Sequence, residues 1–139
     1  MHNEINNSVP ITHNGVTTNY FFSSKHRGAP TTDISVWNIG LDDELNCFSN
    51  SFENGWHNNG FAWGCIISNF NDLLILGENL RNAELKIAKF VTNQNQWHGY
   101  PADVRYKPRD KPLPNILLSW LAKGIISKSL MARIKQGQI

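Results

Sequence analysis

The residues of this chain that are best suited to chemistry gather in one stretch, "NQWHGYPADVRYKPRDKPLPN", at positions 95–115. A histidine that a carboxylate orients is a common general base, and the stretch contains both His98 and Asp103. His57, in the turn "GWHNNG", is a second histidine that an enzyme site could use. His57, His98 and Asp103 are therefore the catalytic candidates. No serine or cysteine is tied to them by a recognisable spacing, so the sequence does not define a reaction.

The same stretch also has the composition of a recognition loop. Four prolines lie between positions 101 and 114, and each fixes φ and biases the residue before it towards extended backbone. We therefore predict a proline-stiffened loop over 95–113 that presents Trp97 and Tyr100 to a partner at low entropic cost. In the alternative, which is favoured because large aromatic side chains usually bury their area, Trp97 and Tyr100 close the end of a sheet and His98 bonds to backbone.

Charge is divided unevenly along the chain, although the net charge is only +2. Residues 1–85 contain three basic and nine acidic side chains, and residues 86–139 contain ten basic and two acidic ones. This division predicts a basic surface that binds an acidic partner protein. In the alternative, the two halves pack together and partly neutralise each other. The expected contact residues are the aromatic and basic side chains of the second half: Trp97, His98, Tyr100, Arg105, Lys107, Arg109, Lys128, Arg133 and Lys135.

Nucleic acid is a second possible partner for the same basic surface. Two helices around Gly124, with Lys128, Arg133 and Lys135 on the second, have the outline of a helix-turn-helix. However, bulky Trp120 precedes the glycine where that motif needs a small residue. An ordinary helical hairpin with a basic solvent face is the favoured interpretation.

No cofactor or metal site is predicted. His57, His98, Cys47 and Cys65 are scattered and lack the paired spacing of metal ligands. The glycines match neither the Walker nor the dinucleotide pattern. The segment "FFSSKHRG" (21–28) gathers groups that can hold an anion, but a solvated loop is the favoured interpretation.

The length of 139 residues and the 40% hydrophobic content suit a single domain, 1–139, with residues 1–7 as a flexible arm. The longest aliphatic run, 73–76, cannot span a bilayer, and "MHNEINNSVP" lacks the features of a signal peptide. Two cysteines are too few for a disulfide framework. We therefore expect a cytoplasmic protein with no membrane contact.

The clearest local signal is the Asn14-Gly15 dipeptide, which predicts a hairpin. Counting outwards from the turn predicts the pairs His13 with Val16, Ile11 with Thr18, and Val9 with Tyr20. Pro10 lacks a backbone donor and places its strand at a sheet edge.

Further strands are predicted at 33–39, 61–68 and 72–77. The last two are joined through "NFN" (69–71) and are expected at the sheet centre, because they are almost continuously apolar. Segment 42–53 is either a helix that Asp42 caps or an irregular stretch. Segment 82–92 favours a helix, with a strand as the alternative.

The C-terminal region predicts a helical hairpin over 114–137. Pro114 suits a first helical turn and Gly124 an end, and Ser127 and Gly137 have the same roles for a second helix. The predicted fold is α+β: an antiparallel sheet of hairpins, mainly from the N-terminal half, with C-terminal helices packed on one side.

These observations favour a small non-catalytic binding module that docks an acidic partner, of the inhibitor, immunity or accessory type. The alternatives are a nucleic-acid-binding protein that uses the same surface, and an enzyme with a site based on His98 and His57.

Overall fold

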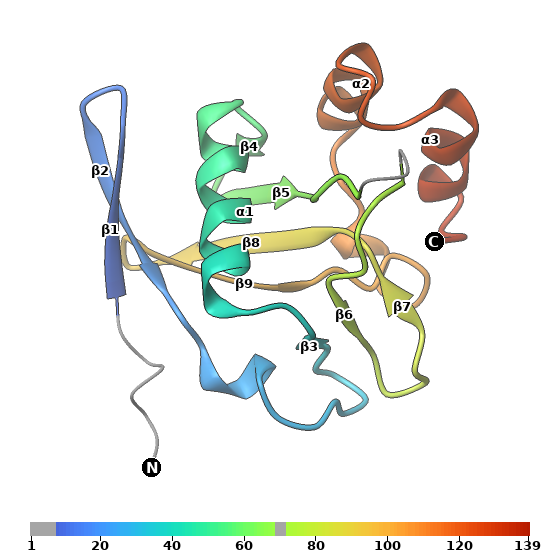
Figure 1. The fold of residues 1–139 in the computed structure, drawn as a ribbon, viewed down its shortest axis with the longest axis horizontal. Helices are drawn as coiled ribbons and strands as arrows, with labels where there is room; N and C mark the ends of the chain where they lie inside the picture. The colour runs from blue at the N-terminus through green and yellow to red at the C-terminus, as the bar shows by residue number, and fades with distance from the viewer. Residues whose placement is uncertain (1–7, 69–71) are drawn as a thin grey trace.

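A six-stranded sheet runs through the centre of the protein (Figure 1). The structure is a computed structural model that describes residues 8–68 and 72–139. All neighbouring strands of this sheet are antiparallel except β2 and β9, and the order is β1-β2-β9-β8-β5-β4. The strands are β1 (Ser8–His13), β2 (Val16–Phe21), β4 (His57–Asn58), β5 (Phe61–Gly64), β8 (Ala88–Asn93) and β9 (Gln96–Pro101). With the three α-helices found in the described residues, this sheet gives the α+β fold that the sequence predicts.

Strands β1 and β2 form the predicted hairpin. Asn14 and Gly15 have φ of 52° and 78°, the left-handed pair that a two-residue hairpin turn requires. Strand β1 is an edge strand, as Pro10 predicts. The predicted register is confirmed: His13↔Val16, Ile11↔Thr18 and Val9↔Tyr20.

The β8–β9 hairpin is the largest departure from the predictions. The helix favoured over 82–92 is wrong, and the loop expected over 95–113 is a strand in its first part, up to Pro101. The turn is made by Gln94 and Asn95, both with positive φ and neither followed by glycine, so it carries no hairpin signature. Pairing with two neighbouring strands overrides the local preference for a helix.

Helix α1 (Leu41–Glu53) covers one face of the sheet (Figure 1). Its Phe48 packs into a cluster with Tyr20, Phe90 and Trp97, which confirms the helical alternative for this segment. The helix begins after Gly40, so Asp42 is not its cap.

Gly99 makes this packing possible. A Cβ atom at this position would lie 2.3 Å from a ring carbon of Phe90 and 2.9 Å from the Tyr20 hydroxyl.

A second, three-stranded sheet contains β3 (Val36–Trp37), β6 (Gly77–Glu78) and β7 (Glu84–Leu85). The strand predicted at 33–39 is present only as β3, and the one predicted at 72–77 overlaps only with the first residue of β6. The strand predicted at 61–68 ends at Gly64. The expected "NFN" connection, 69–71, lies outside the described residues. Leu73 and Leu76 are buried in two different clusters, so the apolar run is a core-crossing connection and not a central strand.

Helices α2 (Pro114–Ala122) and α3 (Lys128–Lys135) lie at the end of the molecule away from the β1–β2 hairpin (Figure 1). Both match the predicted helices. The Ser127 hydroxyl accepts a hydrogen bond from the backbone N–H of Leu130 at 3.0 Å, as an N-cap should. The two helices bury Leu117, Trp120 and Ile134 in a second core cluster.

Candidate binding cleft

The face of the sheet opposite α1 carries a cleft of about 740 Å³. This volume is in the range of small-ligand sites, roughly 300 to 1,000 Å³. Strands β5, β8 and β9 each contribute two side chains to its floor, and their register arranges these side chains in two rows. The outer row is Phe61, Val91 and His98, and the inner row is Trp63, Lys89 and Tyr100.

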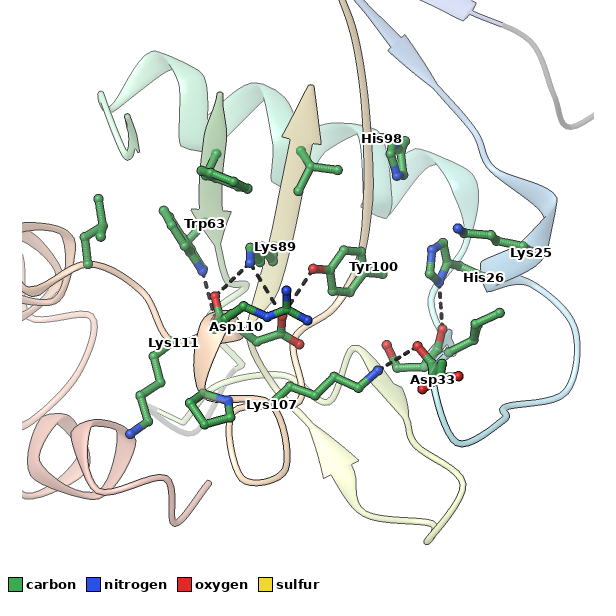
Figure 2. Close-up of a pocket in the computed structure, with 17 residues that line it drawn as sticks. Lys25, His26, Asp33, Trp63, Lys89, His98, Tyr100, Lys107, Asp110 and Lys111 are labelled. Atoms are coloured by element: carbon green, nitrogen blue, oxygen red, sulfur yellow. Dashed lines mark hydrogen bonds and ion pairs between the residues drawn. The ribbon is translucent and has the colours of Figure 1, made fainter. Parts of the chain in front are cut away.

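Residues 107–111, the covering segment, close over the inner row (Figure 2). Trp63 Nε1 donates to the carbonyl of Asp110 at 3.0 Å, and Lys89 Nζ donates to the carbonyl of the preceding residue at 2.7 Å. The Tyr100 hydroxyl donates to the carboxylate of Asp110 at 3.1 Å. The polar atoms of the inner row therefore fix the position of the covering segment.

The outer row remains open to solvent. Phe61 is 42% exposed, and Val91 and His98 are half-buried. The solvent face of an antiparallel sheet is usually polar, so an exposed row of this kind is a candidate contact surface.

The 3-10 helix η1 (Ser24–His26) closes one end of the cleft. The His26 ring lies nearly parallel to those of Tyr100 and His98, with centroids 5.2 and 6.4 Å away, and its Nδ1 bonds to the Ser35 carbonyl at 2.9 Å. Burial lowers the pKa of His26 to about 4. Burial, assisted by the charge of Lys25, also lowers the pKa of His98. Both rings are therefore neutral at pH 7.

Positive charge in the cleft comes from lysine and arginine. Asp33 and Asp110 are the acidic residues of the lining, and Asp110 lies 3.6 Å from Lys89 Nζ, with both side chains buried. Burial lowers the pKa of Lys89, and the nearby carboxylate opposes this shift. Five cationic side chains face these two acids: Lys25, Lys89, Lys107, Arg109 and Lys111.

The four cations other than Lys89 differ in what they do for the fold. Lys107 Nζ donates to the Asp33 carbonyl at 2.6 Å, and Lys111 Nζ donates to a carbonyl of α3 at 2.9 Å. Lys25 and Arg109 are exposed side chains at the rim. These two are therefore the charges best placed to contact a ligand.

Several predicted contact residues do come together. His98, Tyr100, Lys107 and Arg109 all line the cleft. Trp97 does not, and its predicted surface role is wrong. It alternates with His98 on β9, is only 7% exposed and contacts Phe48 and Phe52 under α1.

The other predicted basic contacts lie outside the cleft. Arg105 donates to the carbonyl of Gln138 at 2.8 Å, and Lys128, Arg133 and Lys135 belong to α3. The late cations thus divide between the cleft and the helical end.

Mutual neutralisation of the two halves of the chain is limited. Among residues 8–68 and 72–139, the ion pair between Lys86 and Asp72, at 3.4 Å, is the one that joins an early carboxylate to a late cation.

The catalytic candidates are not brought together. His57 pairs with Ala62 on the α1 side of the sheet and stacks on Phe52 at 4.5 Å, on the face opposite His98. Asp103 is buried beside Asn79, whose amide donates to it at 3.1 Å, and it does not line the cleft. The structure therefore gives no support to a site that joins these three residues.

Cys47 and Cys65 are both buried thiols. Burial raises the pKa of Cys65 to about 12. Within the part of the chain that the structure describes, no group of three or more metal-ligating side chains is present.

Sequence reasoning missed four of the six floor residues: Phe61, Trp63, Lys89 and Val91. The available signal was a lysine inside the alternating run "AKFV", which predicts one polar or partner-facing side of a strand. Segment 21–28, for which the sequence favours a solvated loop, contributes Lys25 and His26 to the cleft.

Comparison of the chain with protein-family models, curated proteins and solved structures finds no match. None of the helices in residues 8–68 and 72–139 is both long and apolar enough to cross a membrane. A function for the protein is therefore proposed from the residues that line the cleft.

Proposed function

We propose that the protein is a non-catalytic binding module that docks an acidic segment of a partner protein in this cleft. The observation that carries the proposal is the lining itself, in which five cationic side chains outnumber two acidic ones around an aromatic floor. Charge complementarity of this kind steers association and fixes the register of a partner. An inhibitor, immunity or accessory protein would have this activity.

The hydrogen bonds within the cleft favour binding over group transfer. Ser35 has the one aliphatic hydroxyl in the lining, and it donates to the Pro101 carbonyl at 2.6 Å. Asp110 is held by Tyr100 and by the backbone N–H of Asp103. The Ser35 hydroxyl and the Asp110 carboxylate, which could serve as nucleophile and base, are thus committed to the fold.

Single-stranded nucleic acid is the second candidate, because rings beside cations also suit stacked bases and phosphates. The cations of α3, which a longer nucleic-acid track would use, lie outside the cleft. The test is a gel-retardation assay with a mixed-sequence single strand. Affinity should fall steeply with salt if several phosphates are neutralised, and an absence of retardation at low salt excludes this candidate.

Charge reversal at the rim tests the docking of an acidic segment. We expect the double variant Lys25→Glu/Arg109→Glu to lose at least about tenfold in affinity for fluorescein-labelled, Glu-rich peptides, measured by fluorescence polarisation. We expect the two charge pairs with the peptide to contribute this much together, since tenfold is about 1.4 kcal/mol. The fold should be maintained, because exposed charges contribute about 1 kcal/mol or less to stability.

The matched control is Lys123→Glu/Lys128→Glu, which changes the net charge equally at exposed positions outside the cleft. We expect this control to bind the peptides within about twofold of wild type. Equal losses in both double variants would mean that the attraction is general and that the cleft is not a docking site.

A further inference from the structure

The outer row of Phe61, Val91 and His98 is the open part of the cleft floor, and its chemistry limits what a ligand must contain. These three side chains lie opposite one another on adjacent strands, so they form a continuous strip across the sheet. We infer that the acidic segment carries an aromatic side chain that packs on this strip, with carboxylates on both sides of it. The inference rests on the proposed function and adds an aromatic side chain to the acidic residues that this function requires of the segment.

The strip has the size of one aromatic side chain. Neighbouring strands are separated by about 4.8 Å, so three strands span roughly 10 Å. A Phe, Tyr or Trp side chain buries about 150 to 250 Å² and would cover most of such a strip. A carboxylate alone would leave the exposed Phe61 ring in water and gain little from it.

Rings at both ends of the strip favour an aromatic anchor over an aliphatic one. Phe61 lies at one end and His98 at the other, and the His26 ring lies nearly parallel to His98 at an interplanar angle of 19°. Offset stacking and edge-to-face contacts between rings add to the area that is buried. Because the half-buried His98 imidazole is neutral at pH 7, desolvating it under a ring costs less than desolvating a cation.

The cations determine where the carboxylates belong. Lys25 lies beside His26 and His98 at the η1 end (Figure 2). Arg109 belongs to the covering segment over the inner row, where its carbonyl accepts from Lys89. A ligand with its ring on the outer row therefore has one exposed cation near the β9 side and another near the inner row.

Three labelled peptides of equal length test the inference by fluorescence polarisation. The first has Phe flanked by acidic residues, the second has Ser in place of Phe, and the third has Gln in place of the acidic residues. We expect wild type to bind the first at least about tenfold more tightly than the second, and the third weakly. The variant Phe61→Ser should lose this preference and bind the first and second peptides about equally.

The control variant is Leu118→Ser, which removes an exposed apolar side chain from α2, outside the cleft. It should retain the wild-type preference for the first peptide. Thermal unfolding followed by circular dichroism should show both variants folded, because Phe61 and Leu118 are exposed.

Other results of these peptide titrations would overturn either the aromatic anchor alone or the proposed function as well. Equal wild-type affinity for the first two peptides, with both lost in Lys25→Glu/Arg109→Glu, would overturn the aromatic anchor and leave the proposed function in place. Equal affinity for a peptide with Leu in place of Phe would show that the anchor is merely apolar. If wild type binds no acidic peptide, or binds oligothymidylate more tightly than any peptide, both the inference and the proposed function fail.

Discussion

His26 is a buried histidine that stays neutral beside the lysines of the cleft. The ring is buried, is held at Nδ1 by the Ser35 carbonyl, and lies against His98 and Tyr100. A protonated imidazole in this position would be desolvated close to Lys25 and Lys107, which also lower its pKa. The folded protein therefore keeps His26 neutral, with a pKa of about 4 against an ordinary 6.5.

This shift predicts a loss of stability in mild acid. Between pH 6.5 and pH 4 the unfolded chain binds a proton at His26 that the folded chain does not, so the free energy of unfolding decreases as pH falls. From pH 7 to pH 5 we expect a loss of about 2 kcal/mol from this residue. Urea unfolding of wild type and His26→Gln at both pH values measures it.

The comparison isolates one imidazole, because other titrating groups are common to both proteins. The variant should be less sensitive to this pH change by about the same 2 kcal/mol, whatever its stability at pH 7. Identical pH dependence in the two proteins would mean that His26 is protonated as easily in the folded chain as in the unfolded one.

Helix α1, strand β2 and the segment that follows η1 are joined by one buried polar network. Glu44 of α1 accepts hydrogen bonds from the Tyr20 hydroxyl of β2 and from Arg27, which follows η1 and also donates to the Ile39 carbonyl. The Glu44 side chain is 2% exposed, and burial raises its pKa. The network thereby connects the segment that carries His26 and Lys25 to the helix on the other face of the sheet.

Removing the cation from this network should be costly. We expect Arg27→Met to lower the free energy of unfolding by about 3 kcal/mol, because a buried carboxylate loses its partner. The double variant Arg27→Met/Glu44→Gln should recover part of this loss, since the remaining amide is neutral and can still bond to Tyr20. Urea denaturation of the wild type, both single variants and the double variant completes the cycle. A double variant that is as unstable as the sum of the two single ones would mean that Arg27 and Glu44 act independently.

The elements that could be predicted from the sequence have their signals in adjacent residues. The Asn14-Gly15 turn, the Ser127 cap and the ends at Gly124 and Gly137 depend on local backbone preference, and the structure has each of them. The β8–β9 hairpin depends instead on pairing between distant segments, because its turn at Gln94 and Asn95 has no distinctive dipeptide.

The same limit applies to the site. His98, Tyr100, Lys107 and Arg109 could be found because aromatic and charged residues are dense in one stretch. The sequence could not show which residues of the stretch face the cleft. Alternate residues of a strand point to opposite faces of the sheet, and the register determines which face each one takes. This is why Trp97 is buried under α1 while its neighbour His98 lies on the open face.

Considered as a whole, the protein has two unlike faces. Helix α1 covers one side of the sheet with a closed aromatic core, and the cleft on the other side gathers cations from η1 and from the covering segment, 107–111. The excess positive charge of the C-terminal half is therefore only partly a property of the cleft, and the rest lies on the helical end. The central claim is that the partner binds at the cleft and not at α3.

The five tryptophans provide the most direct measurement of this claim, because Trp63 alone among them lines the cleft. The measurement is a two-dimensional NMR titration of ¹⁵N-labelled protein with the Phe-containing acidic peptide. We expect the indole N–H of Trp63 and the backbone amides of β8, β9 and the covering segment to shift, with little change at the other four indoles. Largest shifts at α3 or at the Trp97 indole would contradict the claim.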